Sequence, residues 1–158
     1  MTYRDDLLDA YEGEVAGEAF FAGLAELTAE AAEKLNLLAR VERQTARVLL
    51  PLLARHGLAA RDKADLDEQG RRQAAAWASS WLNLARRFAA DYPRYVNAFR
   101  DMAAACPAED RQAIGLLTDH EVAIVAFALA EAEGMPDGAR HLQAYLDQAT
   151  RFLAADGR

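Results

Sequence analysis

The sequence contains few of the residues on which several common protein classes depend. Its 158 residues include one cysteine, two isoleucines and six valines. A single cysteine, Cys106, excludes a disulfide framework and a cysteine-based zinc site. The scarcity of β-branched residues, set beside 37 alanines and 21 leucines, argues against a β-sheet and favours helices.

Long uncharged runs and an excess of positive charge are also missing. The longest runs without charge, Gln73–Ala85 and Val122–Ala130, fall short of the ~20 apolar residues that a membrane-spanning helix needs. With 18 basic and 25 acidic side chains, the net charge is −7, which argues against nucleic acid or an anionic membrane as the main partner. Residues 1–9 are acidic and lack the apolar stretch of a secretory signal, so we expect a cytoplasmic protein.

Motifs of the familiar hydrolases and nucleotide-binding proteins are absent. The sequence has no glycine-rich phosphate loop, no His-Glu-x-x-His zinc motif and no nucleophile elbow. Its only serines, Ser79 and Ser80, stand in no context for nucleophilic catalysis. We therefore assign no catalytic residue from the sequence.

Apolar residues recur at helical spacing through most of the chain, which predicts an all-α protein folded as one domain over residues 1–158. Four core helices within about 4–134 and a short fifth helix over about 138–154 are expected. The core helices are expected at about 4–27, 29–56, 66–105 (interrupted at Asp91–Pro93) and 108–134. Residues 57–68 reach roughly 40 Å when extended, about the length of the second helix. The expected architecture is therefore a four-helix bundle with a long crossover between its second and third helices.

Three of these helices place a carboxylate in an otherwise apolar row. The residues are Glu18 on the first helix (with Glu14, one turn earlier, as the alternate), Glu42 on the second and Glu121 on the fourth. A buried carboxylate costs several kcal/mol unless it is paired, protonated or bound to metal. His120 precedes Glu121, about 100° round the helix, and can complete a ligand set.

The segments around these carboxylates resemble a known family. Residues 11–18 (YEGEVAGE) resemble the first helix of the ferritin-like superfamily, and of rubrerythrin-type proteins in particular. Residues 42–45 and 121–124 stand where that family carries its two Glu-x-x-His motifs. The resemblance covers about residues 5–133, mostly as helix pattern and length. It implies two paired helical hairpins around an iron or manganese centre.

The chain departs from the full di-iron ligand set of four carboxylates and two histidines that the resemblance implies. Thr45 and Ile124 occupy the two histidine positions. The third helix has no carboxylate between positions 71 and 90, and its inward residues are Trp77 and Trp81. These side chains are bulky, and we expect them to fill the space that a second metal ion needs.

The inward carboxylates allow three interpretations. In the first, they form a vestigial polar layer, hydrogen-bonded through protonated glutamate pairs, the hydroxyls of Thr45 and Tyr11, and water. In the second they bind a metal centre of iron or manganese, and in the third they face solvent because the helix faces are misassigned. The candidate metal ligands are Glu18 (or Glu14), Glu42, His120 and Glu121. His120 taken alone is typical of a surface residue or of one that supports a ligand.

The main functional hypothesis is a ferritin-like binding or self-associating protein whose metal site is vestigial. It predicts a homodimer, or a small apolar ligand held near Trp77 and Trp81. The alternative is an iron- or manganese-dependent oxidoreductase of rubrerythrin type, acting on oxygen or peroxide, with Tyr11 as a nearby hydrogen-bond donor. The sequence leaves open whether the protein is an enzyme.

Overall fold

The computed structural model describes residues 1–156 and confirms the all-α class. The chain is 86% helical and has no strand among the described residues. The α-helices are α1 (Tyr3–Leu27), α2 (Ala32–Arg55), α3 (Lys63–Trp77), α4 (Trp81–Asp91), α5 (Pro93–Ala105), α6 (Arg111–Ala132) and α7 (Ala139–Asp156). Short 3₁₀ turns, Ala29–Ala31 and Ala108–Asp110, precede α2 and α6.

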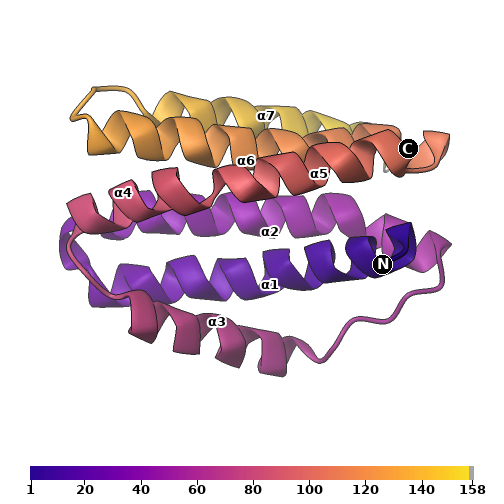
Figure 1. Cartoon of the computed structure of the whole chain (residues 1–158), viewed down its shortest axis with the longest axis horizontal. Coiled ribbons are helices and arrows are strands. Elements are labelled where there is room, and N and C mark those ends of the chain that lie inside the picture. Colours follow the sequence, from indigo (N-terminus) through magenta and orange to yellow (C-terminus); the bar gives the residue numbers. More distant parts are fainter. Residues whose placement is uncertain (157–158) are drawn as a thin grey trace.

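The helices pack as two groups that lie side by side (Figure 1). α1 pairs with α2, and α3 covers the outer side of α1. α4 and α5 follow one another along α6, and α7 packs against both α2 and α6. α2 joins the two groups through its contacts with α6 and α7, whereas α1 and α5 touch only sparingly. This arrangement leaves a cleft between α1 and α5, onto which the candidate site opens.

The start of α1 is capped by Thr2. The hydroxyl of Thr2 accepts a hydrogen bond from the backbone N–H of Asp5 at 3.2 Å, and the Asp5 carboxylate accepts one from the Thr2 N–H at 2.9 Å. This reciprocal capping box satisfies two donors that a helix N-terminus otherwise leaves free. It fixes the register of the helix that carries Glu14 and Glu18.

The segment after α2 differs from the prediction. α3 begins at Lys63, within the expected linker, so the crossover consists of residues 56–62 followed by a helix rather than of one extended loop. The expected third helix is also broken after Trp77. The Ser80 hydroxyl accepts from the backbone N–H of Asn83 at 3.2 Å and so caps a new helix, α4. The predicted break at Asp91–Pro93 is confirmed, with Pro93 in the first turn of α5.

A glycine allows α3 to lie directly on α1. A Cβ added at Gly70 would stand 2.2 Å from the carbonyl oxygen of Ala16 and 2.8 Å from the backbone nitrogen of Phe20. Beside this contact, Leu66 of α3 packs with Val15 and Ala16 of α1. The crossover helix is therefore held at backbone contact distance.

Replacing Gly70 with alanine should lower the free energy of unfolding by about 1–3 kcal/mol, because rigid backbone atoms of α1 must move. The matched control is Gly115→Ala within α6, where an added Cβ meets nothing within 4 Å. That variant should gain up to about 1 kcal/mol from helix propensity. Urea denaturation of both variants measures the difference, and equal effects would show that α3 does not pack this closely.

The two tryptophans belong to an aromatic cluster in the core. Trp77 stacks on Phe88 with ring centroids 6.0 Å apart, and its edge-on partner Phe20 lies at 5.4 Å. Trp81 packs on Phe127 at 6.0 Å, while its indole N–H donates to Glu131. Both side chains are half-buried and pack against the core.

The core also explains the apolar character of α6. The segment Ala108–Ala132, with a mean hydropathy of 1.6 in its most apolar window, is long and apolar enough to cross a membrane by composition alone. However, 67% of that window is buried inside the fold. α6 packs against α2, α4, α5 and α7, as a central helix does.

Candidate metal centre

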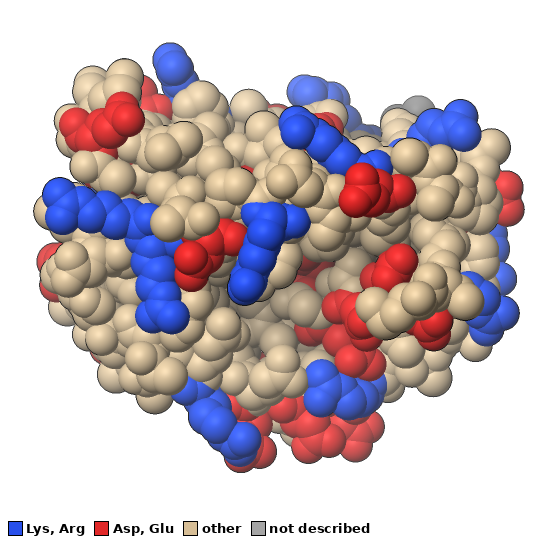
Figure 2. Space-filling model, in the orientation of Figure 1, with Lys and Arg blue, Asp and Glu red and all other residues tan. Residues whose placement is uncertain are grey.

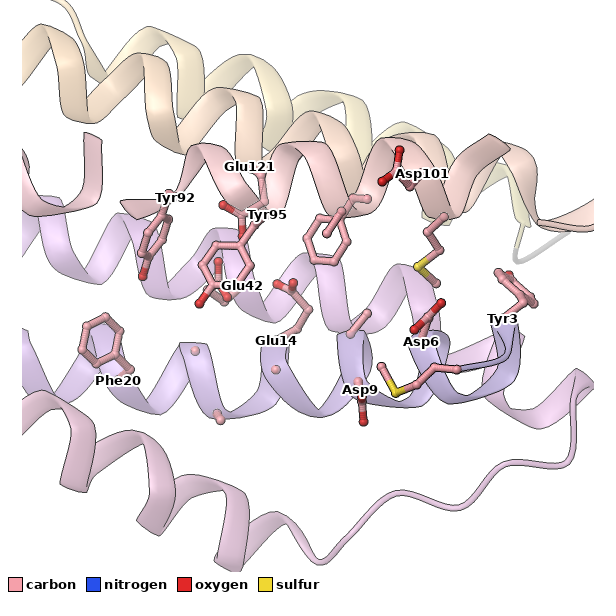
Figure 3. A pocket seen from close by; sticks show the side chains of 18 of the residues that line it. Tyr3, Asp6, Asp9, Glu14, Phe20, Glu42, Tyr92, Tyr95, Asp101 and Glu121 are labelled. Carbon is pink, nitrogen blue, oxygen red and sulfur yellow. The ribbon is translucent and has the colours of Figure 1, made fainter. Parts of the chain in front are cut away.

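Three helices bring one carboxylate each to a single buried point. Glu14 of α1, Glu42 of α2 and Glu121 of α6 surround the imidazole of His120, also on α6 (Figure 3 shows the three carboxylates). The His120 Nε2 atom lies 3.1 Å from Glu14 Oε2, 3.3 Å from Glu121 Oε1 and 3.6 Å from Glu42 Oε1. None of the four residues is more than 5% exposed.

The first helix contributes Glu14, the alternate, and not Glu18. Glu18 lies on the surface, where its Oε1 accepts a hydrogen bond from Arg43 Nε at 2.7 Å. Tyr11, the predicted neighbouring donor, instead packs beside Val15 and Leu66, away from the cluster. The residue first chosen on α1 was thus one turn from the residue observed, and pairing with Arg43 keeps Glu18 at the surface.

The backbone fixes the orientation and tautomer of His120. Its Nδ1 atom donates to the carbonyl oxygen of Leu117, which can only accept. In the neutral imidazole, Nε2 therefore carries a lone pair, and this lone pair faces the three carboxylates. Metal-binding histidines characteristically donate their second ring N–H to a backbone carbonyl or a carboxylate in this way.

The cluster holds too few hydrogen-bond donors for its acceptors. Even a doubly protonated His120 offers a single N–H to three carboxylates. Glu14 Oε2, Glu42 Oε1, Glu121 Oε2 and His120 Nε2 are buried and make no hydrogen bond within the described chain. The Thr45 hydroxyl is already engaged, because it donates to the Val41 carbonyl. Of the donors suggested for a hydrogen-bonded polar layer, the Thr45 and Tyr11 hydroxyls do not serve the cluster, and protons on the glutamates themselves remain.

The spacing of these atoms suits one cation. Two ligand atoms bound at about 2.1 Å to one ion lie roughly 3.0–3.5 Å apart in octahedral or tetrahedral geometry. The observed separations from His120 Nε2 are 3.1, 3.3 and 3.6 Å. Ligand atoms of Glu14, Glu42 and His120 all lie within 4.8 Å of one another. The donor set can close around an ion with small side-chain movements.

The electrostatics of the cluster point the same way. Burial, and then the charge of Glu14, raises the pKa of Glu42 to about 8. Burial likewise raises the pKa of Glu121. Burial alone would lower the pKa of His120, but the charges of Glu14 and Glu121 outweigh it and raise that pKa well above the usual value. The carboxylates thus draw positive charge to this point, and a divalent cation supplies it more fully than a proton.

The predicted departures from a di-iron site are visible in the structure. Thr45 and Ile124 are fully buried, and neither turns a ligand atom toward the cluster: the Thr45 hydroxyl pairs with Tyr145 of α7 at 2.5 Å, and Ile124 is apolar. The expectation that Trp77 and Trp81 fill the second metal space is wrong, since both lie in the aromatic core described above. The ligands present suit one ion.

A cleft of about 680 Å³ opens onto the candidate centre from between α1 and α5. Glu14, Glu42 and Glu121 form part of its lining, as do Tyr92 and Tyr95 of α5 (Figure 3). Neither tryptophan lines it, so the apolar-ligand site expected there is not part of this cleft. The helical spacing of the aromatic residues of α5 is visible in the sequence. Which of them line the cleft with the carboxylates depends on how α5 packs on α6.

A glycine in α1 makes room for one carboxylate. A Cβ added at Gly17 would stand only 2.2 Å from Glu42 Oε2. Gly17 therefore makes room for a side chain of α2. Small residues within helices more usually allow two helix backbones to approach closely. One turn earlier, Gly13 lines the same cleft, and an added Cβ there meets nothing within 4 Å.

These two glycines provide a matched test. Gly17→Ala should weaken Mn²⁺ binding about tenfold or more, because the new methyl group displaces the Glu42 carboxylate. Gly13→Ala should leave Mn²⁺ affinity unchanged and stabilise the fold by up to about 1 kcal/mol. Calorimetric titration with Mn²⁺ measures both, and equal affinities in the two variants would show that Glu42 is not a ligand.

Comparison of the chain with family models, curated proteins and solved structures finds no match. A metal ion at the candidate centre is therefore inferred from the geometry of its residues.

Proposed function

We propose that this protein is a ferritin-like four-helix bundle that binds one divalent transition-metal ion, iron or manganese. α1 and α2 would form one hairpin, α4–α5 and α6 the other, and α3 the crossover between them. The observation that carries the proposal is the buried cluster itself: one imidazole nitrogen faces three carboxylates that lack hydrogen-bond donors.

The choice of metal follows from the ligand types. Three carboxylates and one imidazole form a mostly oxygen donor set, which suits Mn²⁺ or Fe²⁺. A thiolate would favour zinc or copper, but Cys106 lies outside the cluster, and burial raises the pKa of its thiol. Three negative charges beside a neutral His120 leave one in excess over a divalent ion, and this favours tight binding.

A second candidate function is an iron- or manganese-dependent oxidoreductase acting on oxygen or peroxide. The observation that favours it is the cleft, which gives a small molecule access to the centre. When bound, the ion would supply one-electron chemistry at that point. Among the chain's own groups, Leu117 orients His120, and Tyr92 lies at the cleft wall, where burial and the charges of Glu121 and Glu42 keep its phenol protonated by raising its pKa.

Metal content tests the proposal directly. The purified protein is incubated anaerobically with Fe²⁺ or Mn²⁺, desalted and subjected to elemental analysis. We expect about one ion per chain in the wild type and in Glu18→Gln, the surface control, and almost none in Glu121→Gln. No retained metal in the wild type would favour the vestigial layer, and equal retention in all three proteins would place the ion elsewhere.

A further inference from the structure

The cleft over the candidate centre carries more negative charge than one divalent ion balances. No lysine, arginine or histidine side chain is among its lining residues. Six carboxylates line it: Asp6, Asp9, Glu14, Glu42, Asp101 and Glu121. The buried oxygens of the three glutamates also lack hydrogen-bond partners within the described chain. A divalent ion offsets two of these six charges, and the amino group of Met1, which also lines the cleft, offsets one more, so the cleft stays acidic.

These three aspartates line one end of the cleft. Asp6 and Asp9 come from α1 and Asp101 from α5 (Figure 3). No ion pair within residues 1–156 involves any of the three. The molecular surface is hollowed here, and acidic side chains gather along one side of the hollow (Figure 2). A cation entering the cleft would meet a net negative field.

The wall beside the aspartates is aromatic. Tyr95 and Phe99 of α5 lie one turn apart along the cleft, with ring centroids 6.5 Å apart in a stacked arrangement. The guanidinium group of Arg94 already lies 4.8 Å from the centre of the Tyr95 ring. Aromatic faces attract ammonium groups electrostatically and contact apolar groups at the same time. Opposite them, Gly13 and Ala10 leave the α1 side of the cleft open.

We propose that the cleft binds a small organic cation, an amine joined to an apolar body. The ammonium group lies toward the end of the cleft that Asp6, Asp9 and Asp101 line, and the apolar body lies along Tyr95 and Phe99. A cavity of about 680 Å³ has the size of a typical small-molecule site. A role for this amine as a substrate of the metal centre rests on the proposed function. Its binding to the cleft does not.

Three probes with one body and different charges test the inference. They are 2-phenylethylamine, 2-phenylethanol and 3-phenylpropionate, each titrated calorimetrically at low salt into Mn²⁺-loaded and metal-free protein. We expect the amine to bind about tenfold more tightly than the alcohol, and the carboxylate to bind weakest. Raising the salt concentration should reduce the advantage of the amine. An alcohol or carboxylate that binds as tightly as the amine, or an amine that binds neither form, overturns the inference.

Paired variants locate the binding site. Asp6→Asn combined with Asp101→Asn should weaken amine binding about tenfold and leave the alcohol unchanged. The control combines Asp147→Asn with Asp156→Asn on α7, which removes the same charge from exposed positions outside the cleft. Equal weakening by both pairs would show a general charge effect and overturn the inference.

The metal and amine measurements fail independently. Amine binding without retained Mn²⁺ would reject the metal centre and support the cation cleft. Retained Mn²⁺ without amine binding would support the metal centre and reject the cation cleft.

Discussion

Replacing Glu42 with glutamine should abolish tight metal binding and leave the metal-free protein as stable as the wild type, or more stable. Because burial and Glu14 raise the pKa of Glu42 to about 8, its ionised form costs stability in the absence of a cation. Glutamine keeps the size and removes the charge. We expect Mn²⁺ affinity to fall about 100-fold and the metal-free Tm to hold or rise.

Calorimetric titration measures the affinity, and thermal melts of metal-free protein measure the stability. The matched control is Glu33→Gln, the same substitution at an exposed position of α2, which should change neither quantity. If Glu42→Gln bound Mn²⁺ as the wild type does, Glu42 would not be a ligand. If it lost much stability without metal, hydrogen bonds would hold the carboxylate and the vestigial-layer interpretation would be correct.

Replacing Asp110 with alanine should lower the free energy of unfolding by about 2–4 kcal/mol. Asp110 is fully buried and joins α1 and α2 to the start of α6. The Tyr3 hydroxyl donates to it at 2.7 Å, the His56 Nε2 atom lies 2.6 Å away, and Arg55 forms an ion pair with it. Without the carboxylate, the donors on Tyr3, His56 and Arg55 lose their shared acceptor.

Denaturant melts of Asp110→Ala measure this loss. The adjacent exposed residue provides the control: Glu109→Ala should change stability by no more than about 0.5 kcal/mol. An Asp110→Ala variant that is no less stable than this control would show that the network does not hold the helices together.

The same carboxylate should make stability depend on pH. Burial alone would raise the pKa of Asp110, but hydrogen bonds from Tyr3, His56 and Arg55 outweigh it and hold that pKa below its usual value. The unfolded chain therefore binds the proton more readily, so this contribution is present above about pH 5 and is lost as the pH falls below about 4. The stability difference between wild type and Asp110→Asn should shrink over that interval in urea melts.

The sequence predicted the helical class and most helix faces, because amphipathic spacing records which side of a helix is buried. Leu142 and Ala149 of α7 and Ile114 of α6, which stand in apolar rows at helical spacing, are buried. The crossover was harder to predict. α3 has a short apolar row, and its position depends on the backbone contact that Gly70 allows with α1. The break before α4 was signalled by Ser80, a residue type that caps helices.

The candidate centre was predictable in composition but not in register. Glu42, Glu121 and His120 meet as their rows suggested, yet Glu14 takes the place first given to Glu18. The two positions are one turn apart and lie almost on one face, so periodicity cannot separate them. The surface ion pair between Glu18 and Arg43 separates the two positions, and periodicity cannot predict this pair because it is a tertiary contact. The role of Gly17 in admitting Glu42 is likewise visible only after packing.

The central claim is that Glu14, Glu42, Glu121 and His120 hold one divalent metal ion. Anomalous diffraction from crystals grown with Mn²⁺ tests it most directly, because the method locates the ion as well as detecting it. The account predicts a single strong peak, about 2.0–2.3 Å from a ligand atom of each of the four residues. No peak at this point, or a peak only at the surface, would contradict the account.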